Sequence, residues 1–164
     1  MTSFLDKAIS FILLLALMPV ISTIYVILRF LKIDPIFRQS RVGRAGKTFT
    51  ILKFRTMPDN TPEAPTHEIK MGSMPSICLF LRKSKMDELP QLFNVIKGEM
   101  SLVGYRPCLP SQSNLIRLRS SAGILGYLPG ITGKAQIESY DMQFEDRLVE
   151  IESEMYDEWS SKTY

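Results

Sequence analysis

The longest apolar stretch of the chain lies near its N-terminus. Residues 8–28, AISFILLLALMPVISTIYVIL, carry no charge. A helix needs about 20 consecutive apolar residues to cross a bilayer core, so this stretch is long enough for one crossing. After residue 34 the hydrophobic positions are scattered among polar and charged ones, as in a small domain with its own core. We therefore divide the chain into a membrane segment, residues 1–33, and a cytosolic domain, residues 34–164.

The membrane segment admits two paths through the bilayer. A plain spanning helix that anchors an unrelated cytosolic domain is the simpler one. Pro19 lies in the middle of the run and kinks a helix by removing a backbone donor, although spanning helices tolerate such kinks. Lys7 precedes the run and Arg29 and Lys32 follow it, and positive flanks favour the cytoplasmic side. A re-entrant helix that bends at Pro19 and returns would satisfy both flanks, whereas a cleaved signal peptide is disfavoured by the length of the run.

Beyond the membrane segment the chain alternates between short strands and helices. Period-two alternation predicts strands over 36–39 and 48–57, and Gly43 and Gly46 mark a turn between them. The stretch GRAGKT lacks the first glycine of a phosphate-binding loop, so a hairpin turn is favoured. Further along, the pattern predicts helices over 76–83, 87–97, 111–121 and 144–160, a strand over 100–104, and loops over 58–70 and 126–136. The expected fold class is a mixed, helix-rich α/β domain with short strands.

Charge and cysteine content narrow the classes of partner. The net charge of +3 is too small to indicate nucleic acid. Residues 29–55, however, hold eight Lys or Arg against one acid, Asp34. This segment favours anionic lipid headgroups or a phosphorylated substrate, or it serves only as a topology signal. The cysteines have no CxxC neighbour and are expected to be reduced thiols. Because His67 is the single histidine, a His/Cys metal site is disfavoured, whereas a hard cation held by carboxylates is not.

Two adjacent carboxylates, Asp87 and Glu88, stand at the start of the helix expected over 87–97. One interpretation is structural: Asp87 caps the helix, whose dipole stabilises acids at this end. The other is chemical, because the same end can hold Asp87 ionised as a nucleophile toward a phosphate diester. Such an attack needs cations to offset the charge repulsion. The candidates are Lys53, Arg55, Arg82 and Arg106, together with a magnesium ion held by Asp87 or Glu88.

Four motifs together resemble the bacterial sugar transferase family, the monotopic phosphoglycosyl transferases. They are FRQSRVG, ILKFRTM, LRKSKMDELPQLFNVIKGEMSLVGYRP and PGITGKAQI, in this order and at fitting spacings. With the apolar N-terminal run and its central proline, the resemblance covers nearly the whole chain. It implies that the membrane segment is a re-entrant helix broken at Pro19, and that the catalytic domain lies on the cytoplasmic face of the bacterial inner membrane.

The resemblance also implies an activity. Enzymes of this family transfer a sugar 1-phosphate from a UDP-sugar to undecaprenyl phosphate and release UMP, which starts a surface glycan or glycoconjugate. The match places the catalytic dyad at Asp87 and Glu88, with Asp87 forming a covalent phosphosugar intermediate and magnesium as cofactor. Arg106 and Arg82 match arginines expected near the diphosphate. The expected partners are the UDP-sugar, undecaprenyl phosphate and membrane lipids, with no nucleic acid; a homodimer is left open.

Several positions depart from the family pattern. Tyr105 replaces a proline in GPRP, Lys134 replaces a leucine, and Met18 replaces a serine before the breaking proline. Glu152 is expected to stand for the aspartate of the last helix, and the C-terminal end is expected to be short relative to the family. These departures leave the dyad and Arg106 in place. They keep open an alternative in which the chain is a catalytically degenerate scaffold at the membrane surface of a glycan-assembly complex.

Overall fold

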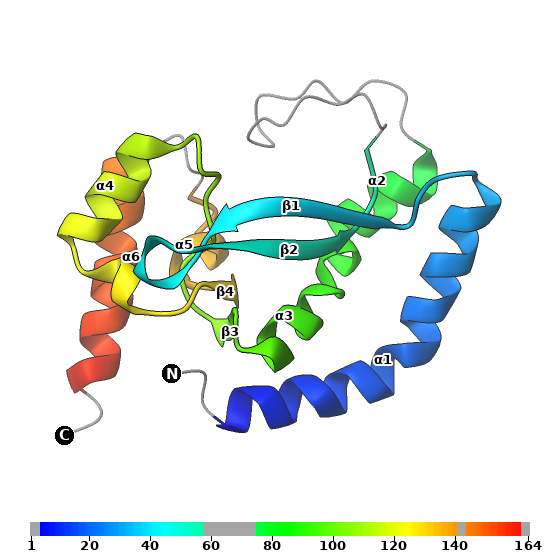
Figure 1. Ribbon diagram of the computed structural model, residues 1–164, viewed down its shortest axis with the longest axis horizontal. Coiled ribbons are helices and arrows are strands. Elements are labelled where there is room, and N and C mark those ends of the chain that lie inside the picture. The colour runs from blue at the N-terminus through cyan, green and yellow to red at the C-terminus, as the bar shows by residue number, and fades with distance from the viewer. Residues whose placement is uncertain (1–3, 58–74, 141–143, 162–164) are drawn as a thin grey trace.

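The computed structural model describes residues 4–57, 75–140 and 144–161 and shows a mixed, helix-rich α/β chain (Figure 1). Its helices are α1 (Phe4–Phe30), α2 (Ser76–Lys83), α3 (Gln91–Lys97), α4 (Ser113–Ser121), α5 (Lys134–Ile137) and α6 (Glu145–Ser161). Its strands are β1 (Ile36–Val42), β2 (Thr48–Phe54), β3 (Ser101–Val103) and β4 (Gly130–Thr132). The expected fold class is confirmed in this form, and both cysteines, Cys78 and Cys108, are buried and free. The predicted loop over 58–70, with His67, lies outside the described residues.

β1 and β2 form the long antiparallel hairpin that crosses the molecule in Figure 1. Ile36 pairs with Phe54 at its open end, and Val42 pairs with Thr48 next to the turn. The turn is a short 3-10 segment, η1 (Arg44–Gly46), in which Gly46 has φ +71°, a left-handed conformation that glycine adopts without steric cost. The predicted hairpin is thus confirmed, although β1 continues to residue 42 and β2 ends at residue 54 rather than 57.

β3 and β4 form a short parallel pair, in which Ser101 lies opposite Gly130 and Val103 opposite Thr132. The prediction of a loop over 126–136 is therefore wrong, because this stretch contains β4 and most of α5. Glycine makes the pairing possible: a Cβ on Gly130 would lie 2.1 Å from the backbone nitrogen of Gly104. A three-residue strand has too few alternating positions to be recognised from its period, so the sequence pattern does not reveal it.

α1 is a continuous helix of 27 residues with Pro19 inside it, and its axis bends between its two halves in Figure 1. Thr23 Oγ1 donates a 2.8 Å hydrogen bond to Pro19 O, an interaction that often accompanies helix bending. An 18-residue window of α1 has a mean hydropathy of 2.6 and only 17% of it is buried, so α1 could cross a membrane by length and composition. The helix is not interrupted at Pro19, and the re-entrant path stays a prediction.

Two hydrophobic clusters hold the helices at the two ends of the hairpin. At one end, Leu28 of α1 packs with Phe54 of β2 and Leu81 of α2. At the other end, α4 and α6 pack together through residues such as Leu115 and Ile151. Figure 1 shows α3, β3 and β4 between these two groups. The candidate site is formed by β2, by the turn between α2 and α3, and by the turn that follows β3.

Candidate active site

Asp87 and Glu88 lie in a 3-10 turn, η3 (Met86–Glu88), between α2 and α3. The turn begins at Lys85, in a left-handed conformation (φ 60°), and Glu88 N donates to Lys85 O at 3.1 Å. Pro90 precedes α3 and has no N–H to donate to Met86 O, so the α-helix does not extend back to the dyad. The helix predicted over 87–97 is therefore shorter than expected. The interpretation of Asp87 as its cap is wrong, because Pro90 takes that position.

Glu88 is held by two cations from distant parts of the chain. Its Oε1 accepts hydrogen bonds from Lys53 Nζ at 2.8 Å and from a terminal guanidinium nitrogen of Arg106 at 2.9 Å. Lys53 comes from β2, and Arg106 comes from the turn after β3. Burial raises the pKa of the Glu88 carboxyl, but Arg106 and Lys53 together lower it by more, to about 2. Glu88 is therefore an ionised and immobilised carboxylate at neutral pH.

A buried amide on α3 fixes the strand that carries Lys53. Asn94 is fully buried, and its Nδ2 donates to Thr50 O at 2.8 Å while its Oδ1 accepts from Leu52 N at 3.1 Å. Burial and the charge of Arg106 lower the pKa of Lys53 to about 8. Sequence reasoning misses Asn94; the available signal is a polar residue among the apolar residues of a short helix, a position that usually requires a specific partner.

Asp87 is as buried as Glu88 but has different surroundings. Its exposed fraction is 8%, and its Oδ1 has no hydrogen-bond partner within the described part of the chain. Burial raises the pKa of the Asp87 carboxyl, and the charges of Lys53, Arg82 and Lys85 oppose that rise. A buried carboxylate oxygen with no structural partner is uncommon, and in a cation-rich site it is typical of a group that takes part in binding or chemistry.

The other two predicted cations, Arg82 and Arg55, are differently placed. Arg82 lies half-buried in the last turn of α2, and its charge acts on the dyad aspartate. Arg55 is only two residues from Lys53 but follows the end of β2. Its guanidinium donates to Asp34 Oδ2 at 3.2 Å and lies 5.8 Å from the centre of the Phe37 ring. The structure thus places Arg55 against Asp34, and its predicted role toward the substrate stays a prediction.

The dyad also offers oxygen atoms to a hard cation. Residues 4–57, 75–140 and 144–161 contain no group of three or more His, Cys, Asp or Glu side chains that could hold a metal by themselves. Mg²⁺, however, is commonly held by one or two carboxylates together with substrate phosphates and water. The buried, unpaired Oδ1 of Asp87 beside Glu88 fits that arrangement. Asp87 and Glu88 are therefore the residues that would hold the predicted magnesium ion.

The turn that carries Arg106 is tied to the hairpin. Cys108 O accepts a hydrogen bond from Val42 N of β1 at 2.9 Å. Pro107 O accepts one from a guanidinium nitrogen of Arg41 at 3.2 Å. Sequence reasoning misses this role of Arg41, because its partner is a backbone carbonyl 66 residues away and leaves no mark on the local pattern.

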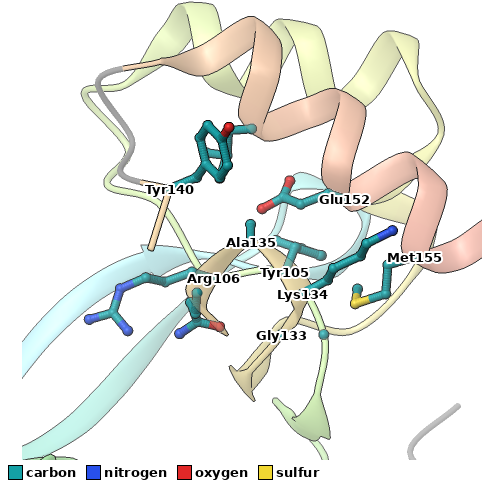
Figure 2. A pocket seen from close by; sticks show the side chains of 11 residues that line it. Tyr105, Arg106, Gly133, Lys134, Ala135, Tyr140, Glu152 and Met155 are labelled. Carbon is teal, nitrogen blue, oxygen red and sulfur yellow. The ribbon is translucent and has the colours of Figure 1, made fainter. Parts of the chain in front are cut away.

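A hollow lies beside the same turn, between Gly104–Arg106, α5 and α6 (Figure 2). Its lining includes Tyr105, Lys134, Tyr140 and Glu152. In Figure 2 the Arg106 side chain extends away from Lys134 and Glu152. Arg106 thus lines the hollow and also reaches Glu88 of the dyad.

Comparison with known proteins identifies the family. The chain matches the family model described as bacterial sugar transferase over residues 1–163, and it belongs to that family. It is 33% identical over 165 residues to the UDP-glucose:undecaprenyl-phosphate glucose-1-phosphate transferase of Escherichia coli (strain K12), covering 94% of the chain and 36% of the relative.

Two further relatives show the same partial overlap. The chain is 35% identical over 147 residues to the Klebsiella pneumoniae protein of the same name, covering 82% of the chain and 30% of the relative. It is 35% identical over 152 residues to the UDP-galactose-lipid carrier transferase of Erwinia amylovora, covering 79% of the chain and 30% of the relative. The chain therefore spans 30% to 36% of the length of these three relatives.

Proposed function

We propose that the chain is a membrane-bound phosphoglycosyl transferase. It moves a sugar 1-phosphate from a UDP-sugar to undecaprenyl phosphate and releases UMP. The observation that carries the proposal is the contrast within the dyad: Asp87 is buried with an unpaired oxygen, next to a Glu88 that Lys53 and Arg106 hold in place. The Escherichia coli and Klebsiella pneumoniae relatives are both named as UDP-glucose:undecaprenyl-phosphate glucose-1-phosphate transferases, which supports this kind of exchange.

In the first step the Asp87 carboxylate attacks the phosphorus atom that carries the sugar. An oxygen–phosphorus bond forms, the bond from that phosphorus to the bridging diphosphate oxygen breaks, and UMP leaves with the electron pair. The carboxylate and the diphosphate are both negative, so the step needs positive charge at the site. Lys53 and Arg106 supply this charge from positions that Glu88 fixes. A magnesium ion held by Asp87 and Glu88 would neutralise further charge on the phosphate oxygens.

In the second step an oxygen of undecaprenyl phosphate attacks the phosphorus atom of the aspartyl phosphosugar. The bond to Asp87 breaks, the carboxylate is restored, and the lipid diphosphosugar is the product. The acceptor phosphate lies at the membrane surface, so the site must lie there too. The support for this placement is α1, which packs against α3 next to the dyad and exposes apolar side chains such as Phe11, Leu15 and Phe30. We place this site on the cytoplasmic face of the bacterial inner membrane, with α1 as a re-entrant helix.

The Asp87→Asn variant tests the nucleophile. UMP release is measured with a panel of donors that begins with UDP-glucose, UDP-galactose and UDP-N-acetylgalactosamine, since relatives are named for these sugars. The variant should lose turnover by about a thousandfold or more while it stays folded and membrane-bound. Asp157→Asn, at an exposed acid of α6, is the matched control and should keep wild-type turnover.

Two results would count against this proposal. Turnover by Asp87→Asn at the wild-type rate would exclude Asp87 as the nucleophile. A wild-type chain that is folded and membrane-bound but releases no UMP from any donor would instead favour the catalytically degenerate scaffold. Intact-mass measurement of the wild type with donor alone supplies an independent check, because the covalent intermediate adds the mass of the sugar phosphate to the protein.

A further inference from the structure

A buried ion pair joins α4 to α6 next to the turn that carries Arg106. Arg119 is 0% exposed and Glu152 is 2% exposed. Arg119 Nε donates to Glu152 Oε2 at 2.9 Å, and a terminal nitrogen of Arg119 donates to Glu152 Oε1 at 2.6 Å. Two parallel hydrogen bonds fix the plane of a guanidinium group as well as its position. The Arg119 guanidinium is therefore fixed in both position and orientation, and another side chain can pack against its flat face.

Tyr105 is locked onto this ion pair. The Arg119 guanidinium lies 4.8 Å from the centre of the Tyr105 ring, and Tyr105 is 1% exposed. The Tyr105 N–H donates to Tyr156 Oη of α6 at 3.1 Å, and the Tyr105 carbonyl accepts from Gly130 N at 2.8 Å. The ring, the N–H group and the carbonyl of a single residue are thus each held by a different partner.

The next residue along the chain, Arg106, is the one that reaches the dyad. Its side chain is 32% exposed and donates to Glu88. An arginine side chain has several rotatable bonds, so its guanidinium is placed accurately only when the backbone from which it starts is fixed. Tyr105 provides that fixed start, because it immediately precedes Arg106.

We propose that Arg119, Glu152, Tyr105 and Tyr156 form a positioning unit that places Arg106 beside the dyad. The proposal rests on the proposed function, and it gives α6 a part in the reaction without contact with the substrate. A buried ion pair adds little net stability, because the desolvation of both charges offsets their attraction. The contribution of the ion pair is instead to fix the orientation of the Tyr105 ring, which packs against the Arg119 guanidinium. Tyr105 departs from the proline of the family pattern, and its ring is the group that rests on the pair.

The Tyr156→Phe variant tests the unit with the loss of one hydroxyl group. The substitution keeps the ring, whose centroid lies 3.9 Å from that of the stacked Tyr127 ring. We expect kcat/KM for UMP release to fall about three- to tenfold, the scale of one lost hydrogen bond. Tyr127→Phe, in the other ring of the same stack, is the matched control and should keep wild-type turnover.

A double-mutant cycle with Arg106 separates positioning from a general loss of stability. Arg106→Ala removes the group that the unit places. Tyr156→Phe should therefore cause no further loss of kcat/KM in the Arg106→Ala background. Effects that multiply independently would overturn the proposal, because they would show that the Tyr156 hydroxyl acts through something other than Arg106.

A second measurement does not depend on turnover. The coupling between Arg106 and Glu88 is obtained from thermal unfolding of Arg106→Ala, Glu88→Gln and the double variant. In the Tyr156→Phe background this coupling should shrink to about half or less. An unchanged coupling would overturn the positioning unit. Wild-type turnover by Asp87→Asn would overturn the proposed function but leave this coupling as it is, so the two failures are distinguishable.

Discussion

At the scale of single residues, Asp87 and Glu88 are neighbours whose surroundings give them different properties. Glu88 is paired with two cations that lower its pKa to about 2, whereas burial raises the pKa of Asp87, one of whose oxygens is unpaired. When the surroundings of two adjacent carboxyl groups shift their pKa values in opposite directions, the two residues typically have distinct roles in one site. Glu88 suits an anchor for Lys53 and Arg106, and Asp87 suits the group that reacts.

Glu88→Gln tests the anchor through its pH dependence. The pKa of Glu88 lies below its ordinary value of 4.5 in the folded protein, so its ionised form stabilises the fold above that pH. This stability is lost as the pH falls from 4.5 toward 2. At pH 7 the variant should lose about 2–3 kcal/mol of unfolding free energy, because Lys53 and Arg106 are left without their acid.

The acid range provides the sharper comparison for the same variant. Wild-type stability should fall steeply as the pH drops from 4.5 toward 2, and Glu88→Gln should show a shallower fall. Circular dichroism during thermal unfolding in detergent measures both slopes. Glu150→Gln, at an exposed acid of α6, is the control and should retain the wild-type slope. Equal slopes in the wild type and Glu88→Gln would contradict the anchoring role.

At the scale of elements, glycines decide which backbones can approach each other. β3, which pairs with β4, directly precedes the turn that carries Arg106. Gly130 N of β4 donates a hydrogen bond to the Tyr105 carbonyl in that turn. A side chain on Gly130 would meet the Gly104 nitrogen at 2.1 Å and Thr132 O at 2.6 Å. The pairing therefore depends on the absence of a side chain at this position.

Gly130→Ala should lower the free energy of unfolding by more than about 2 kcal/mol, because neither backbone can shift without breaking the pair. It should also lower the rate of UMP release. Gly126→Ala is the matched control, since a Cβ at Gly126 meets nothing within 4 Å, and its effect should stay within about 0.5 kcal/mol. Chemical unfolding of the two variants beside the wild type measures the difference. Equal stabilities would contradict the steric argument.

One departure from the family pattern acts between elements. Lys134 begins α5, and its Nζ lies 3.0 Å from a carboxylate oxygen of Glu154 and 3.1 Å from one of Glu158, both on α6. The three side chains are partly or largely exposed, so each pair adds little stability. Lys134 thus links α5 to α6.

At the scale of the whole molecule, the site is assembled from three segments. β2 supplies Lys53, η3 supplies the dyad, and the turn after β3 supplies Arg106. In Figure 1 these segments lie between the α4–α6 end of the hairpin and the end formed by α1 and α2. The placement of α1 in a membrane would therefore also determine the distance of the dyad from lipid headgroups.

The re-entrant path of α1 predicts that both of its ends lie on one side of the membrane. Single cysteines in place of Ser3, Ile33 and Ser120 should react with an impermeant reagent from the same side of sealed vesicles, in a background without Cys78 and Cys108. Ser120 is exposed on α4 and reports the side on which the domain after α1 lies. Labelling of residues 3 and 33 from opposite sides would support a single-pass anchor instead.

Local signals in the sequence were sufficient for the elements whose causes are local. The apolar run of α1, the glycine turn of the hairpin, and the helices α2, α4 and α6 all follow from periodicity and turn residues within a few positions. The motif around Asp87 and Glu88 likewise marked the acidic pair whose Glu88 the structure places beside Lys53 and Arg106. The three-residue strand β4 was not predicted, because its pairing depends on a close approach of Gly130 to Gly104, which is distant in the sequence.

The tertiary structure alone decided which charged groups meet. Arg55 and Arg106 were both candidates by residue type, yet Arg55 lies against Asp34 and Arg106 reaches Glu88. The pairing of Arg119 with Glu152 across 33 positions was likewise invisible to any local pattern. The physical reason is that residue type and spacing set the conformation of short segments, whereas charge pairing and burial depend on where the folded backbone carries side chains from distant segments.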